Sequence, residues 1–127
     1  MRGILLFGHG ARDPAWAEPF LHIRERVLAS DPAACIECAF LELMQPSFAE
    51  AIDSLVRQGA DEIVVVPVFI AAGGHVKQDL PHLVAQAMTR HPGVMITLAA
   101  PVGEAAMVLQ AMADYALGQG MSESGRS

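Results

Sequence analysis

Positive charge is scarce in this sequence, which has 8 Lys and Arg against 14 Asp and Glu and a formal net charge of −6. This balance argues against a nucleic-acid partner, because neutralising phosphates requires a basic face. No unbroken apolar run reaches the roughly 18 to 20 residues that span a bilayer. The chain begins on a strand-like pattern rather than on a charged leader. We therefore expect a cytoplasmic protein without a membrane partner.

Cysteine is also scarce, with only Cys35 and Cys38 in the chain. Their C-x-x-C spacing is one that redox and zinc sites use. Both lie inside a predicted strand, however, where residues three apart point to opposite faces of the sheet. The pattern therefore favours two separate thiols in a reducing compartment over a chelating pair.

What the sequence does have is apolar content, at 53% of 127 residues, enough for the core of one domain. Strand and helix patterns alternate along the whole chain. We predict strands over 3–8, 34–42, 62–70 and 94–100, and helices over 13–30, 47–58, 76–90 (starting between 76 and 81) and 104–117. A single domain over 1–117 and a flexible Gly/Ser-rich tail over 118–127 are expected.

Local signals mark several of these boundaries. Asp13 followed by Pro14 is a helix N-cap with proline in the first turn. Ser47 with Glu50 three residues later forms a capping box. Pro67 removes one hydrogen-bond donor from the third strand, so a break or bulge is expected there.

Four strand–helix units predict an α/β fold with an open four-stranded parallel sheet, right-handed crossovers and helices on both faces. The expected strand order is 2-1-3-4, with the topological switch between the first and third strands. The last predicted helix is apolar on most of its sides. Such a helix usually has a second surface to bury, so we expect a partner subunit.

Two histidines come directly after the two strands at this switch point. His9 lies between glycines after the first strand, and His75 follows Gly73 and Gly74 after the third. Ligands of open parallel sheets bind outside the carboxyl ends of the strands. The two imidazoles could therefore meet at one divalent metal ion, for which imidazole is a good ligand. Each histidine taken alone could equally end a strand in an ordinary turn.

Glu42, near the end of the second strand, is a third candidate ligand, and an exposed strand-end carboxylate is the alternative. Arg12 and Lys77 follow the two histidines closely and could pair with substrate carboxylates, or be ordinary solvated charges. Of the remaining histidines, His22 is expected at the surface and His91 in a turn. For His82, a surface position is favoured over a metal contact.

Three segments together resemble the CbiX family, the small class II chelatases of sirohydrochlorin. They are Gly8-His9-Gly10-Ala11-Arg12-Asp13-Pro14, Phe40-Leu41-Glu42 leading to Gln45-Pro46, and Gly73-Gly74-His75-Val76-Lys77-Gln78-Asp79-Leu80-Pro81. The third segment is the specific one, and the similarity covers roughly residues 3 to 117. One departure is visible, because Ala11 stands where the family usually has Ser, so that a hydroxyl near the first histidine is missing.

The resemblance implies ATP-independent insertion of Co²⁺ into sirohydrochlorin on the anaerobic route to cobalamin, with a homodimer as the working form. Fe²⁺ and Ni²⁺ are inserted by relatives. By the same resemblance, His9 and His75 hold the metal and are catalytic, because they assist deprotonation. Glu42 is expected as a further metal ligand from its place at the end of the second predicted strand. The expected substrate-binding residues are Gly10, Ala11, Arg12, Gly73, Gly74 and Lys77. No Gly-x-x-x-x-Gly-Lys-[Ser/Thr] motif for a nucleotide is present.

Three other functions remain open on the sequence alone. One is a sirohydrochlorin ferrochelatase for sirohaem synthesis, which differs only in the metal. Another is a non-catalytic carrier of metal or tetrapyrrole on the same fold. A phosphoryl-transfer domain is the least favoured, because the first strand does not end on paired acidic residues.

Overall fold

The computed structural model describes residues 1–71 and 73–126, and it describes no side chain for His75 or for residues 121–126. Four parallel strands form one sheet in the order β2-β1-β3-β4. This confirms the predicted order 2-1-3-4. The strands are β1 (Arg2–Gly8), β2 (Cys35–Phe40), β3 (Glu62–Pro67) and β4 (Met95–Leu98). The helical elements are η1 (Pro14–Ala17), α1 (Glu18–Ser30), α2 (Phe48–Arg57), α3 (Gly74–Arg90), η2 (Val102–Glu104) and α4 (Ala106–Arg126).

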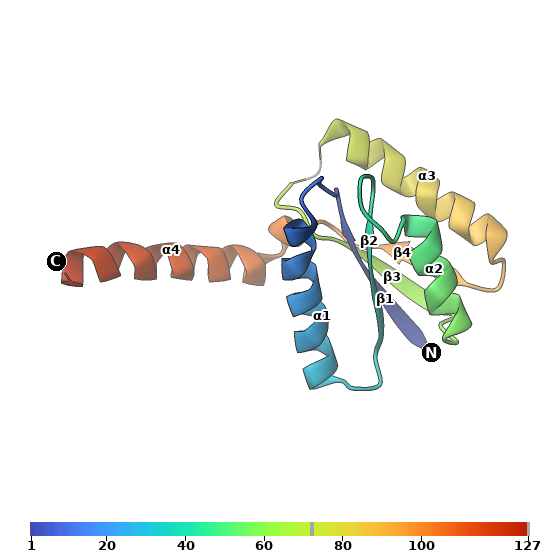
Figure 1. Ribbon diagram of the computed structural model, residues 1–127, viewed down its shortest axis with the longest axis horizontal. Helices are drawn as coiled ribbons and strands as arrows, with labels where there is room; N and C mark the ends of the chain where they lie inside the picture. The colour runs from blue at the N-terminus through green and yellow to red at the C-terminus, as the bar shows by residue number, and fades with distance from the viewer. Residues whose placement is uncertain (72, 127) are drawn as a thin grey trace.

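Helices cover both faces of the sheet, as predicted, with α1 on one side and α2 and α3 on the other (Figure 1). Alternate residues of β1 divide between the two cores: Leu5 and Phe7 pack under α2 and α3, and Leu6 packs under α1. The cysteines divide in the same way, since Cys35 belongs to the first core and Cys38 to the second. Both are free and buried, and burial raises the pKa of the Cys38 thiol. The prediction of two separate thiols is confirmed.

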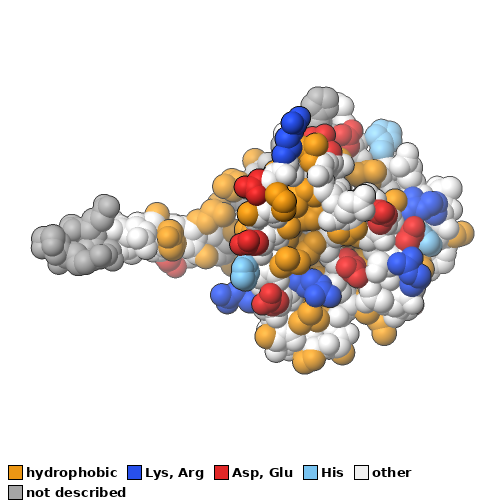
Figure 2. All heavy atoms as spheres, in the orientation of Figure 1, with side chains coloured by type: hydrophobic (Ala, Val, Ile, Leu, Met, Phe, Trp, Pro, Cys, Tyr) orange, Lys and Arg blue, Asp and Glu red, His pale blue; other side chains and the backbone are white. Residues whose placement is uncertain are grey.

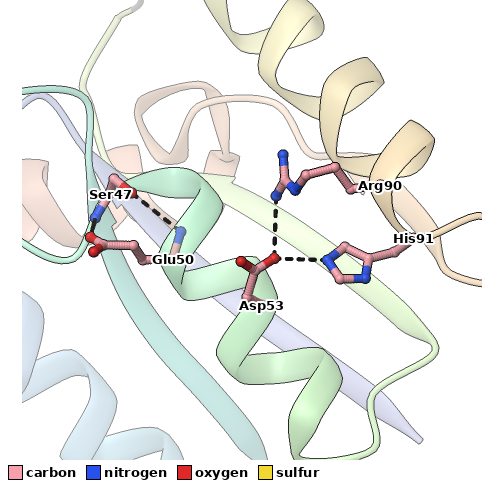
Figure 3. A network of polar contacts seen from close by, with 5 residues as sticks. All are labelled: Ser47, Glu50, Asp53, Arg90 and His91. Carbon is pink, nitrogen blue, oxygen red and sulfur yellow. Dashed lines mark hydrogen bonds and ion pairs between the residues drawn. The ribbon is translucent and has the colours of Figure 1, made fainter.

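The predicted capping residues make the expected hydrogen bonds. The Asp13 carboxylate accepts from the backbone N–H of Ala15 at 3.0 Å, at the start of η1. At the start of α2, the Ser47 hydroxyl accepts from the Glu50 N–H, and the Glu50 carboxylate accepts from the Ser47 N–H at 2.8 Å (Figure 3).

The predicted boundaries of three elements differ from the observed ones. The third strand ends at Pro67 rather than Ile70, because proline has no N–H for the ladder. The second strand is Cys35–Phe40, shorter at both ends than 34–42. The third helix begins at Gly74, before the expected 76–81, and contains Pro81 in its interior. Burial of Val76, Leu80 and Ala87 against the sheet compensates for the hydrogen bond that Pro81 cannot make.

A polar contact joins α2 to the end of α3 on the face of the sheet that these two helices cover (Figure 3). Asp53 of α2 accepts from His91 at 2.7 Å and from Arg90 at 3.3 Å. The hydrogen bond from His91, and after it the one from Arg90, hold the pKa of Asp53 below its usual value. His91 is the C-cap of α3, so its predicted place in a turn is confirmed.

The last helix is the largest departure from the prediction. It was expected over 104–117, but α4 starts at Ala106 and continues to Arg126. Figure 1 shows it projecting away from the sheet and the other helices. Within the described part of the chain, no helix is long and apolar enough to cross a membrane.

Candidate functional site

The loops that leave β1 and β2 are joined by backbone hydrogen bonds beyond the ends of the strands. The N–H of Leu41 donates to Gly8 O at 2.9 Å, and the N–H of Glu42 donates to His9 O at 3.1 Å. The parallel pairing of the two strands therefore continues into the loops. This contact places His9 and Glu42 side by side at the carboxyl edge of the sheet.

Gly10 allows the two loops to approach this closely. Its φ of +99° is in the left-handed region, which residues other than glycine rarely adopt. A Cβ on Gly10 would stand 1.9 Å from the Glu42 carbonyl oxygen. The glycine after the first histidine is thus required by the backbone, independently of any ligand.

The His9 and Glu42 side chains meet in the open part of this edge. His9 Nε2 lies 3.2 Å from Glu42 Oε1, and the two side chains are 48% and 57% exposed. With its proton on Nε2, the imidazole donates to the carboxylate, so that Nδ1 is the free acceptor. The pair combines a proton acceptor with an anionic oxygen, and both are accessible to a ligand.

His75 reaches the same edge of the sheet from β3. The loop after β3 leaves beside β1, since the N–H of Val68 donates to Phe7 O at 2.8 Å. His75 is the second residue of α3, whose N-cap is Gly73 and whose first turn is closed by the bond from Lys77 N–H to Gly73 O at 3.0 Å. The His75 side chain lies outside the description, so its approach to His9 stays a prediction.

The charged residues expected near a substrate lie at the surface. Arg12 and Lys77 are exposed, and neither forms an ion pair with any residue that the structure describes. Ala11 is half-buried beside Gly10. His22 on α1 and His82 on α3 are both exposed. Their expected surface positions are confirmed.

Two apolar residues near this edge were missed by the sequence analysis. Leu43, directly after Glu42, is exposed and has a φ of 68°, which is unusual for a branched side chain. Ile70, in the loop after β3, is exposed as well. The available signal was the position of both residues at strand ends, since Leu43 directly follows the predicted second strand and Ile70 is the last residue of the predicted third strand.

Among the side chains that the structure describes, no group of three His, Cys, Asp or Glu is placed to hold a metal ion. The described part of the site is therefore the His9–Glu42 pair. A two-residue centre of this kind leaves coordination positions open, which suits binding and transfer of an ion better than permanent storage.

Comparison with known proteins places the chain in a family. The sequence profile named CbiX matches residues 3–117. The chain belongs to the CbiX family. A curated relative, the sirohydrochlorin cobaltochelatase of Saccharolobus solfataricus, is 36% identical over 109 residues, covering 81% of this CbiX chain and 84% of the relative. The resemblance stated from the three sequence segments is confirmed.

Solved structures of similar proteins share the fold. A putative cobalamin biosynthesis CbiX protein from Marinobacter aquaeolei superposes with a TM-score of 0.81 at 33% identity, and the match covers 100% of both chains. The sirohydrochlorin chelatase SirB from Bacillus subtilis subspecies spizizenii, in complex with cobalt, gives a TM-score of 0.71 at 33% identity, covering 80% of this chain and 43% of SirB. A SirB structure from Bacillus subtilis with Fe³⁺ gives 0.70 at 31% identity, with coverages of 80% and 40%.

Proposed function

We propose that this CbiX chain is a sirohydrochlorin cobaltochelatase that inserts Co²⁺ at the carboxyl edge of its sheet. It works as a homodimer in the cytoplasm, and the domain over 1–117 carries the activity. The observation that supports this most is the His9–Glu42 pair, exposed at the strand ends of a chain 36% identical to a protein of that activity. Metal is a substrate in this reaction and leaves with the product.

The separation of the pair suits one metal ion. Two ligand atoms at about 2.1 Å from an ion lie about 3.0 to 3.4 Å apart when the angle between them is about 90° to 109°. His9 Nε2 and Glu42 Oε1 are 3.2 Å apart. An ion can therefore replace the proton between them without moving either loop. The loops are held by their backbone bonds and by Gly10.

Insertion requires the removal of two protons from the macrocycle. Co²⁺ forms bonds to the ring nitrogens as two pyrrolic N–H bonds break. Each proton passes to a base, so the charge of the ring complex balances. No ATP takes part in this step. Once the ion has left His9 Nε2 for the ring, that nitrogen is free again and accepts one of these protons. Glu42 stabilises the imidazolium that forms and orients the ring.

His75, at the start of α3 beyond the neighbouring strand β3, is the second metal ligand and the second base in this proposal. Its support is its position in the first turn of α3, at the same edge of the sheet as His9. A tetrapyrrole bound at this edge lies next to the two segments that carry His9 and His75. Two bases are then available for the two protons.

The rest of the edge fits a flat, carboxylated ring. Arg12 and Lys77 are exposed cations without partners among the described residues, and they bind the substrate carboxylates. Gly10, Ala11, Gly73 and Gly74 let the backbone approach the ring closely. Leu43 and Ile70 supply exposed apolar surface against which the ring plane packs.

Iron is the alternative metal. The SirB structures contain cobalt in one case and Fe³⁺ in another, and nitrogen and oxygen ligands bind both divalent ions. Cobalt is preferred because the curated relative with 36% identity is named for it.

The test is an anaerobic insertion assay with purified protein, sirohydrochlorin, and Co²⁺, Fe²⁺ or Ni²⁺, followed by absorbance. We expect catalysed insertion with multiple turnovers and the highest kcat/KM with Co²⁺. A higher kcat/KM with Fe²⁺ would make the protein a ferrochelatase. Stoichiometric binding without turnover would contradict the enzymatic function and support a carrier.

A further inference from the structure

The only tryptophan of the chain is exposed beside the candidate site. Trp16 lies on η1, seven residues after His9, and it is 41% exposed. Tryptophan is a highly buried residue type on average, because its large ring gains much by leaving water. The indole N–H of Trp16 has no hydrogen-bond partner among the residues that the structure describes. Figure 2 shows hydrophobic side chains at the surface around the start of α1, which directly follows η1.

Aromatic contacts join Trp16 to the strand ends from which the site is built. The rings of Trp16 and Phe20 have centres 5.7 Å apart. The ring of Phe20 in turn meets that of Phe40, the last residue of β2, at 5.1 Å. Phe20 also covers the last residue of β1, since a Cβ on Gly8 would lie 2.3 Å from Phe20 Cζ. Trp16 is therefore the outermost ring of an aromatic series that begins at the ends of β1 and β2.

The same contacts limit how far Trp16 lies from the site. Together with the bond lengths of the rings, they place the Trp16 ring centre within about 11 Å of Gly8 Cα. His9 is the next residue along the chain. A tetrapyrrole with its carboxylated side chains is roughly 15 Å across by its covalent dimensions. A macrocycle bound at His9 can therefore extend to Trp16.

The turn that carries Trp16 also carries a cation. Arg12 lies four residues earlier, and both side chains are exposed. Two hydrogen bonds to Asp13 hold the turn: the carboxylate accepts from the Ala15 N–H and the carbonyl oxygen from the Trp16 N–H, both at 3.0 Å. Pro14 restricts the backbone further. The turn thus presents a flat apolar ring together with a guanidinium, the two groups that recognise a flat ligand bearing carboxylates.

We infer that Trp16 packs against the macrocycle of bound sirohydrochlorin and raises the affinity for this substrate. The inference rests on the function proposed above and adds a residue that recognises the substrate without touching the metal. The face of the indole contacts the outer part of the macrocycle, and Arg12 pairs with a carboxylate on the same side of it. Because this contact is the same before and during metal insertion, Trp16 acts on KM and not on kcat.

The place of Trp16 complements the other exposed apolar residues of this edge. Leu43 and Ile70 are 60% and 67% exposed, and they follow β2 and β3. Trp16 follows β1, which lies between those two strands in the sheet. Only the indole adds stacking on a π-system to the burial of apolar area. The contribution of Trp16 should therefore require a flat ring and not merely an apolar side chain.

The test compares full-length variants by absorbance titration of metal-free protein with sirohydrochlorin. Trp16→Leu keeps an apolar side chain against Phe20 but removes the flat ring, and Trp16→Phe keeps a flat ring. Leu21→Ala, which removes a 49% exposed apolar side chain from α1, is the control. We expect Kd to rise about five- to tenfold in Trp16→Leu, to stay within about threefold of wild type in Trp16→Phe, and to be unchanged in Leu21→Ala. Far-UV circular dichroism checks that all four proteins are folded.

Insertion kinetics on the same samples separate binding from chemistry. We expect the KM for sirohydrochlorin to rise with Kd in Trp16→Leu, while kcat and the KM for Co²⁺ keep their wild-type values. A Trp16→Leu variant that binds sirohydrochlorin as tightly as wild type would overturn the inference. A loss of affinity that Trp16→Phe shares in full, or a fall in kcat alone, would also overturn it, because either result indicates a structural role.

The two measurements also keep this inference apart from the proposed function. A wild type that binds sirohydrochlorin but inserts no metal would contradict the enzymatic function, and the Kd values would still decide the role of Trp16. A wild type that binds no sirohydrochlorin would overturn both.

Discussion

At the scale of single residues, the contact between the His9 and Glu42 loops depends on a glycine. Gly10 has a left-handed φ, and the Glu42 carbonyl oxygen occupies the space that a Cβ would need. The hydrogen bond from the Glu42 N–H to the His9 carbonyl oxygen joins the same two loops. The pair at 3.2 Å is therefore a consequence of the backbone as much as of the two side chains.

Gly10→Ala should destabilise the fold by about 2 to 4 kcal/mol, because it adds backbone strain to a steric conflict. Gly93→Ala is the matched control, since nothing lies within 4 Å of the Cβ it would add, and it should change stability by less than about 0.5 kcal/mol. Urea unfolding followed by circular dichroism measures both free energies. Equal stability of the two variants would show that the loops do not meet as described.

The sequence predicts part of this site and misses the rest for a physical reason. The positions of His9, His75 and Glu42 after strands could be predicted, because strand patterns depend on local periodicity. The His9–Glu42 distance and the positive φ of Leu43 depend on how two loops, distant in sequence, pack together. Local patterns carry no information about that packing.

At the scale of elements, α2 and α3 are joined by the contact of Asp53 with His91 and Arg90 (Figure 3). The pKa of Asp53 is lower in the folded protein than its ordinary value, first because of His91. A carboxyl group with a lowered folded pKa stabilises the fold above its unfolded pKa of about 4, and this contribution is lost as the pH falls through the folded value.

Asp53→Ala should therefore lower the free energy of unfolding at pH 7 by about 1 kcal/mol or less, as expected for a partly exposed ion pair. At about pH 3 or below, the difference from wild type should shrink, because Asp53 itself becomes protonated. Glu25→Ala, at an exposed position of α1, is the control and should show neither effect. An Asp53→Ala deficit that is as large well below pH 3 as it is at pH 7 would contradict the assigned contact.

Element ends show where sequence rules are reliable. Asp13, Ser47 and Glu50 cap as predicted, because capping is a contact between residues two or three positions apart. The start of α3 was predicted between 76 and 81, which is later than the observed start at Gly74. In the folded chain, burial of Val76 and Leu80 extends the helix toward its N-terminus past Pro81.

At the scale of the whole molecule, the net charge of −6 opposes a substrate that carries carboxylates. Arg12 and Lys77 are each close in sequence to an acidic residue, Asp13 and Asp79, so the local balance near the site is close to neutral. The long-range field is therefore repulsive for the tetrapyrrole and attractive for Co²⁺.

Raising the ionic strength should consequently lower the KM for sirohydrochlorin and raise the KM for Co²⁺. Going from about 0.01 M to about 0.15 M salt shortens the Debye length from about 30 Å to about 8 Å, and we expect changes of about threefold in each constant. Steady-state insertion rates at several salt concentrations measure both. A rising KM for the tetrapyrrole would mean that contacts with Arg12 and Lys77 outweigh the overall charge.

The strand order of the molecule was predictable, and the path of α4 was not. Alternating strands and helices allow few topologies, and 2-1-3-4 follows from them. The apolar composition of 104–117 indicated a buried helix, but not where it lies. That path depends on the packing of Gly103 against Ile70, a contact between residues far apart in sequence.

The central claim is that His9 takes part in metal insertion, and its most direct test is the Co²⁺ insertion rate of His9→Ala. His22→Ala, which removes an exposed imidazole from α1, is the control. We predict that kcat/KM falls by about 100-fold or more in His9→Ala and stays at the wild-type value in His22→Ala, with both variants folded. A wild-type rate in His9→Ala would contradict the account.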